Sequence, residues 1–172
     1  MSQATGSQAE ANRTRIDLAC LVSDRIELRS VTLAKCSAGR SRAVDTRAEN
    51  FKAELTLKYG YSKDAEEKTL TVFLEFHLMG GNPQVKPSQS LRVDATFVLA
   101  YSIASFENLT DANLGAFAEV NGIFQAWPFW REFVLNTTAR MGVHPLTLPV
   151  HRVSHLPIGE GPSQKELPLF DE

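Results

Sequence analysis

The most informative stretch of this chain is residues 122–153, which read GIFQAWPFWREFVLNTTARMGVHPLTLPVHRV. Both tryptophans of the protein and three of its ten phenylalanines lie in this stretch, and no recognisable catalytic motif accompanies them. Large aromatic side chains supply much contact area at a low entropic cost. The stretch therefore indicates contact with other polypeptides before it indicates chemistry, although any single ring can equally belong to the core.

The same stretch predicts helices and a strap of extended chain. Pro128 is expected in the first turn of a helix that Gly142 ends. A preceding helix, capped by Asp111, is expected to run to about Phe124, which leaves a break between the two helices. Residues 145–150, PLTLPV, contain two prolines and are expected to lie extended on the body of the protein.

Upstream of the helices, apolar and polar residues alternate along three segments: 51–59, 70–79 and 91–103. This period of two predicts strands. A further strand is expected over 26–35, where a shift of phase near Arg29 predicts a β-bulge. Short polar connections indicate antiparallel pairing, whereas residues 37–50 are numerous enough to cross over the sheet. We therefore expect an α+β fold, in which a four-stranded antiparallel sheet with a crossover connection is followed by two helices packed on one face.

The length of 172 residues and the apolar content of 43% suit a single domain. We expect residues 1–10 to be a disordered N-terminus, 11–153 to form the domain and 154–172 to be a flexible tail. A short helix is expected over residues 9–22.

Composition and local sequence exclude several classes of protein. The formal net charge of −2 is not that of a nucleic-acid-binding protein. The first residues lack the basic and apolar regions of a secretory signal, and no apolar run is long enough for membrane insertion. Cys20 and Cys36 match no zinc or redox spacing, and free thiols are typical of a reducing compartment. The protein is therefore expected to be cytoplasmic.

No motif in the chain carries recognisable chemistry. The four histidines lack the short ligand spacing of a zinc site, and the sequence contains no phosphate-binding loop or nucleophile elbow. Glu75 and Asp94 share one face of the predicted sheet, but a solvated sheet face gives the same pattern. We expect no enzymatic activity, no metal and no cofactor. The alternative is a small-ligand-binding protein or enzyme with a pocket between sheet and helices.

The C-terminal half also carries a series of short motifs in a fixed order. They are Asn121, Ile123-Phe124, Trp127-Pro128-Phe129-Trp130-Arg131-Glu132, Thr137-Thr138, Arg140-Met141-Gly142 and Pro145-Leu146-Thr147-Leu148-Pro149-Val150. This series, after four strands, resembles the SecB family of export chaperones over residues 24–153. The chain departs from the acidic members of that family, because Lys52, Lys58 and Arg92 lie at outer positions of the sheet. It is more similar to the divergent SecB-like proteins, some of which serve toxin–antitoxin systems.

The resemblance implies a molecular chaperone, a holdase that binds non-native or extended polypeptides through an apolar groove. Its setting would be protein export and translocation or toxin–antitoxin control, and its partners would be client polypeptides with SecA or an antitoxin. The resemblance also implies a homo-oligomer, either a dimer or a tetramer built as a dimer of dimers. The wide apolar arc of the last helix independently predicts a second subunit or a ligand.

The groove is expected to be formed by the last helix, the break before it and the crossover connection. The candidate peptide-binding residues are Ile123, Phe124, Trp127, Phe129, Trp130 and Phe133. Several of them are expected to be core, Trp130 in particular because it shares a stripe with Val134 and Met141. Phe124 and Trp127 are favoured for client contact, because apolar side chains beside a break are harder to bury.

Overall fold

The computed structural model describes residues 3–42, 44–82, 90–151 and 163–164. Its elements in chain order are α1 (Gln3–Ser23), β1 (Ile26–Arg40), β2 (Lys52–Asp64), β3 (Thr69–Gly81), β4 (Ser90–Ile103), α2 (Asp111–Phe117), the π-helix η1 (Ala118–Gly122), α3 (Ile123–Arg140) and β5 (Ser163–Gln164). The predicted α+β class is confirmed. Of the tail expected over residues 154–172, only β5 lies within the described residues.

The strands form one sheet in the order β1-β4-β3-β2-β5. The first four are antiparallel to their neighbours, and the two-residue β5 pairs parallel to β2. Because β1 is an edge strand and β2 lies three places away, residues 41–51 form the crossover that the sequence predicts. The pairing of β1 with β4 skips Arg29, which confirms the predicted bulge, and skips Ala34, which the sequence did not indicate.

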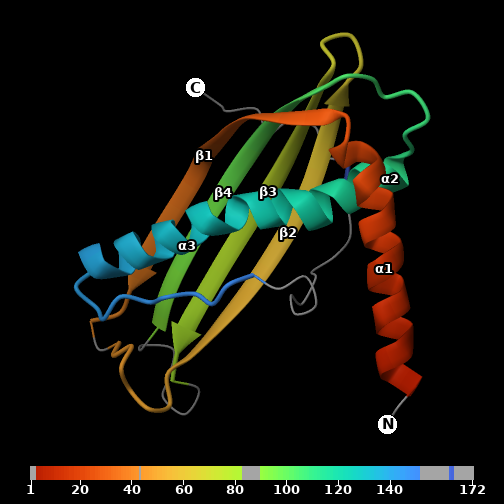
Figure 1. The fold of residues 1–172 in the computed structure, drawn as a ribbon. Coiled ribbons are helices and arrows are strands. Elements are labelled where there is room, and N and C mark those ends of the chain that lie inside the picture. The colour runs from red at the N-terminus through yellow and green to blue at the C-terminus, as the bar shows by residue number, and fades with distance from the viewer. Residues whose placement is uncertain (1–2, 43, 83–89, 152–162, 165–172) are drawn as a thin grey trace.

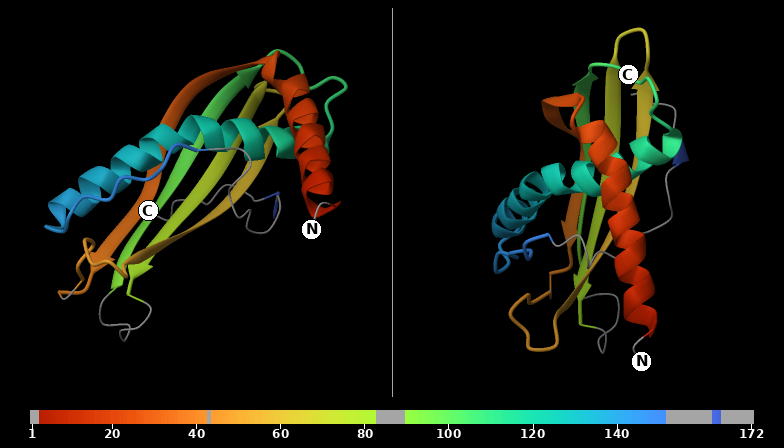
Figure 2. Two further views of the ribbon diagram at one scale, coloured as in Figure 1. Left: turned by 60° about the horizontal axis from the view of Figure 1, so that its bottom comes forward. Right: turned by 45° about the vertical axis from the view of Figure 1, so that its right-hand side comes forward.

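The core lies on one face of the sheet, under the continuous run of α2, η1 and α3, which crosses the strands obliquely (Figure 1). Every second residue of β3 and β4 faces this layer and is buried, from Leu70 to Leu78 and from Leu91 to Ile103. Both views in Figure 2 place the described helices on this same face. The opposite face carries polar residues with some apolar ones, among them the buried Phe73 and the exposed Met79.

A single π-helical turn replaces the predicted break between the helices. An α-helix that buries Leu114, Phe117 and Ala118 would next bury Asn121, which the sequence places on that face. In the structure η1 adds one residue to the turn, so that Gly122 is buried instead and Asn121 is half-buried. This shift keeps both halves of the helical run against the sheet.

The N-terminal helix α1 is longer than the predicted helix over residues 9–22, since it already includes residues 3–10. It packs beside α2 at one end of the sheet (Figure 1). Ala19 and Val22 are buried there, and the Asn113 side chain donates a hydrogen bond to the Leu18 carbonyl at 3.3 Å. Neither α1 nor another helix in the described ranges has the length and apolar character needed to cross a bilayer.

Candidate polypeptide-binding site

The six predicted binding residues lie on α3, and the structure separates them by exposure. Three of them belong to the core and expose at most 5% of their surface: Ile123, Trp127 and Trp130. Phe133 is half-buried, with its ring stacked beside that of Trp130. Phe124 and Phe129 are exposed at 62% and 44%. The exposed rings are therefore Phe124 and Phe129, which point away from the sheet.

Trp127 is covered although the sequence places it beside a break between helices. That break does not exist, because α3 continues from Ile123 through Pro128 to its end. Pro128 removes one helical hydrogen bond without ending the helix, since the residues before and after it pack on the same sheet. The Trp127 indole is covered by the following segment: its Nε1 donates to the Pro149 carbonyl at 3.0 Å, and the His151 ring lies 5.2 Å away.

The segment over residues 145–150 lies extended along α3, as the two prolines predict (Figure 1). Side chains of α3 hold its backbone in place. Arg131 Nε donates to the Leu148 carbonyl at 2.9 Å, and the Leu146 amide donates to Thr138 Oγ1 at 3.0 Å. The Leu148 side chain is itself buried. One flank of α3 is thus closed by the chain itself.

Further exposed apolar side chains lie on α3 and on β1, and the sequence did not single them out as binding residues. Phe124 and Leu135 are eleven residues apart, so they lie within about 20° of each other around the helix, whereas Phe129 lies about 140° from Phe124. Leu135 is exposed at 38%, and Leu28 and Leu33 on the edge strand β1 at 38% and 42%. Leu28 and Leu33 pair with Tyr101 and Phe97 of β4, so they lie on the core face of the sheet. They stay exposed because β1 is the edge strand.

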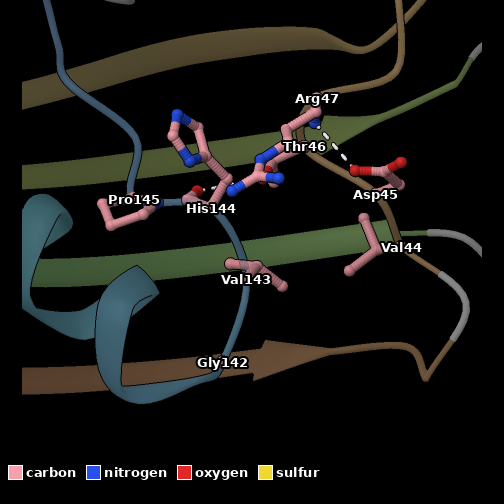
Figure 3. Close-up of a pocket in the computed structure, with 8 residues that line it drawn as sticks. All are labelled: Val44, Asp45, Thr46, Arg47, Gly142, Val143, His144 and Pro145. Carbon is pink, nitrogen blue, oxygen red and sulfur yellow. Dashed lines mark hydrogen bonds between the residues drawn. The ribbon is translucent and has the colours of Figure 1, made fainter.

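A hollow of about 540 Å³ lies where the crossover meets the turn after α3, and we call it the crossover hollow (Figure 3). Its lining consists of Val44, Asp45, Thr46, Arg47, Gly142, Val143, His144 and Pro145. Thr46 Oγ1 donates to the His144 carbonyl at 2.9 Å and ties the two segments together. Asp45 Oδ1 accepts the Arg47 amide at 2.9 Å, which shapes the crossover loop. The sequence predicts the crossover as part of a groove but not these residues.

The opposite face of the sheet carries a row of polar contacts centred on Asp94. Its carboxylate accepts hydrogen bonds from Ser37 at 2.9 Å and from Arg92 at 2.6 Å, and it lies 2.9 Å from His77 Nδ1. Burial alone would raise the pKa of Asp94, but the hydrogen bonds from His77, Arg92 and Ser37 outweigh it and lower the pKa. The carboxylate is held charged, as a structural anion rather than an acid. In the register of β3 and β4, Asp94 lies opposite His77, whereas Glu75 lies opposite Thr96.

Aromatic side chains of the core lie between α3 and the middle of the sheet. Phe76, Phe97 and Trp130 fill the space under α3, with Phe76 stacked on Trp130 at 5.1 Å and edge-on to Phe97 at 6.0 Å. Within the described ranges no group of three or more His, Cys, Asp or Glu side chains is placed to hold a metal ion.

A protein of known structure shares this architecture. No protein-family profile and no curated protein sequence matches the chain. Among solved structures it is similar to a SecB-like chaperone of Mycobacterium tuberculosis, solved in complex with a ChAD peptide from the HigA1 antitoxin. The TM-score is 0.71 at 22% identity, and the match covers 79% of this chain and 97% of that one. The chain has a SecB-like fold.

A second solved structure is similar over a comparable length but less closely. It is a protein of unknown function from Streptococcus agalactiae, with a TM-score of 0.44 and 7% identity over 72% of this chain and 96% of that one. The SecB-like fold confirms the resemblance that the motifs of the C-terminal half indicate.

Proposed function

We propose that this protein is a holdase chaperone that binds non-native or extended polypeptides on the exposed side of α3. The observation that carries the proposal is the exposure of Phe124 and Phe129, at 62% and 44%, on a helix whose other face is fully packed. Exposed apolar patches commonly mark interaction sites, and aromatic side chains are enriched among the residues that supply binding energy. A surface that binds only unfolded chain keeps its client from folding by mass action.

The SecB-like fold supports the same proposal, since the M. tuberculosis protein with this fold was solved with a peptide bound. We extend the peptide-binding role to this chain, acting in the cytoplasm. Its client would be an antitoxin or a set of preproteins, and in the second case SecA would be the downstream partner.

We further propose that the protein acts as a homo-oligomer, a dimer or a tetramer. The support is the edge strand β1, whose outer edge pairs with no other described strand and whose Leu28 and Leu33 are exposed at 38% and 42%. A long unpaired edge with apolar side chains favours association with a second copy. Analytical ultracentrifugation at micromolar concentration tests this, and a single 19.0 kDa species would contradict it.

Suppression of aggregation tests the chaperone proposal. A chemically unfolded client is diluted into buffer with wild-type protein, with the double variant Phe124→Ala/Phe129→Ala, or with the matched control Met79→Ala. Met79 is 57% exposed on the opposite sheet face, so its change removes exposed apolar surface at a place away from α3. We expect wild type and the control to suppress light scattering and the double variant to lose most of this activity. No suppression by the wild type at a stoichiometric ratio would overturn the proposal.

A further inference from the structure

We propose that the crossover hollow receives acidic side chains of the client, so that the preferred client segment carries Asp or Glu close to its apolar residues. This inference rests on the proposed chaperone function and adds a selection by charge to it.

The first support is the arginine side chains around the crossover hollow. Arg47 lines the hollow, and its side chain lies over it (Figure 3). Arg40 reaches it from the end of β1, since its Nη2 lies 3.9 Å from the position that a Cβ atom on Gly142 would take. Arg42 precedes the lining segment by two residues, and Arg140 precedes Gly142 by two.

The second support is that these cations are not neutralised within the described part of the chain. Arg42, Arg47 and Arg140 are exposed, and none of the three forms a salt bridge there. Arg15 and Arg92, by contrast, are paired with Glu119 and Asp94. Among the described residues no carboxylate forms a salt bridge with these three arginines, so they can bind an anion from outside.

Opposing charges near the hollow are fewer. Asp45 lines it, but one of its carboxylate oxygens already accepts the Arg47 amide, and Glu49 is exposed on the same crossover. The end of α3 adds a partial negative charge, which Arg40 and Arg140 offset. Arg47 lines the hollow and Arg40 reaches it, while Arg42 and Arg140 lie within two residues of its lining in the sequence. Asp45 and Glu49 are the carboxylates on the same segments, so these segments carry more positive than negative charge in a chain whose overall formal charge is −2. Such a local field attracts acidic partners over roughly a Debye length.

The position of the hollow relative to α3 gives the expected spacing in a client. Along the helix axis Leu135 precedes Gly142 by about 10 Å and Phe124 precedes it by about 27 Å. An extended chain advances about 3.3 Å per residue. A client that lies along α3 would thus place its acidic residue about three positions from one apolar side chain and about eight from another.

Peptide binding tests the inference. Fluorescence anisotropy is measured with labelled peptides that carry Phe and Leu at this spacing and two Asp, two Asn or two Lys at the acidic position. We expect the Asp peptide to bind about fivefold more tightly than the Asn peptide at low ionic strength, and added salt to reduce this preference. The variant Arg47→Gln/Arg140→Gln should lose the preference. Arg13→Gln, which removes an exposed arginine on α1 that forms no salt bridge among the described residues, should retain it.

The possible results distinguish the proposed selection by charge from the proposed chaperone function. Equal binding of the three peptides, or tighter binding of the Lys peptide, would overturn the charge selection and leave the chaperone proposal standing. Failure of every peptide to bind would overturn both. Tighter binding of a single-stranded RNA oligonucleotide than of the Asp peptide would also overturn the inference, because the arginines would then serve phosphate.

Discussion

The indole of Trp130 stacks on the ring of Phe76, with the ring centroids 5.1 Å apart and the planes 13° from parallel. This contact joins α3 to the middle of β3, and both side chains are completely buried. The indole Nε1 of Trp130 is buried without a hydrogen-bond partner in the described part of the chain. Trp130 therefore belongs to the core, and changes at this position should act on stability.

Trp130→Ala is expected to lower the free energy of unfolding by about 3–5 kcal/mol, because it leaves a large cavity between α3 and the sheet. Trp130→Phe should cost clearly less, since it keeps an aromatic ring against Phe76 and removes a buried N–H that lacks an acceptor. Urea denaturation followed by circular dichroism measures both. An alanine variant as stable as the wild type would contradict the assignment to the core.

Phe124→Ala is expected to have the opposite profile. Its ring is 62% exposed, so the free energy of unfolding should change by no more than about 0.5 kcal/mol. If the ring anchors a client, the same change should weaken peptide affinity by roughly 2 kcal/mol. Peptide affinity is measured by calorimetric titration and stability by thermal melting, both on the same preparation of the variant. A large loss of stability with unchanged affinity would remove Phe124 from the site.

Gly122→Ala is expected to destabilise the protein by about 1–3 kcal/mol through overpacking. A Cβ atom at this position would lie 2.9 Å from Val72 Cγ1, where the π-helical turn approaches the sheet. Val72→Ala in the same chain should recover part of the loss, which a double-mutant cycle detects. Gly39→Ala is the control, because a Cβ atom there would meet nothing within 4 Å.

Glu119→Gln is expected to loosen α1. The Glu119 carboxylate accepts hydrogen bonds from Arg15 at 2.9 Å and from Tyr59 at 3.0 Å, and so joins α1, η1 and β2. Burial and then the neighbouring Glu119 charge raise the pKa of Tyr59, so this hydroxyl remains a donor. We expect faster hydrogen exchange in α1 and a loss of about 1 kcal/mol. Lys63→Gln, which breaks only an exposed pair with Asp111, should leave exchange in α1 unchanged.

Acidification is expected to loosen the segment that covers Trp127. Burial lowers the pKa of His151, so the folded state binds this proton less readily than the unfolded state does. The associated stability is present above the ordinary histidine pKa of about 6.5 and is lost as the pH falls through the lowered value. Tryptophan emission between pH 7.5 and 5 should report this change, and His151→Gln should reduce it. An identical pH profile for that variant would assign the change to another group.

Part of the architecture follows directly from local pattern. Alternation from Leu70 to Leu78 and from Leu91 to Ile103 predicts both strands and their buried face, because a strand turns successive side chains to opposite sides. The phase shift at Arg29 predicts its bulge for the same reason. Gly142, with φ of +70°, ends α3 as predicted, since glycine accepts this conformation readily.

Other features depend on contacts distant in sequence and could not be predicted locally. One difference is local: the helix cap is Thr110 rather than the predicted Asp111, because Thr110 and Asn113, three residues apart, exchange hydrogen bonds in a capping box. The π-helical turn arises where the run of helix must keep two apolar stripes on one sheet. Trp127 is buried only because Pro149 and His151 return to cover it.

The sequence by itself determined the class of fold and the resemblance on which the proposed function rests, since hydrophobic periodicity and the motifs of residues 121–150 are local properties. Only the tertiary structure decided which aromatic residues face the solvent. Burial depends on what packs over a side chain, and for α3 that covering comes from the sheet on one side and from residues 145–151 on another. The arginines at the crossover hollow likewise come together only when β1, the crossover and the end of α3 meet in space.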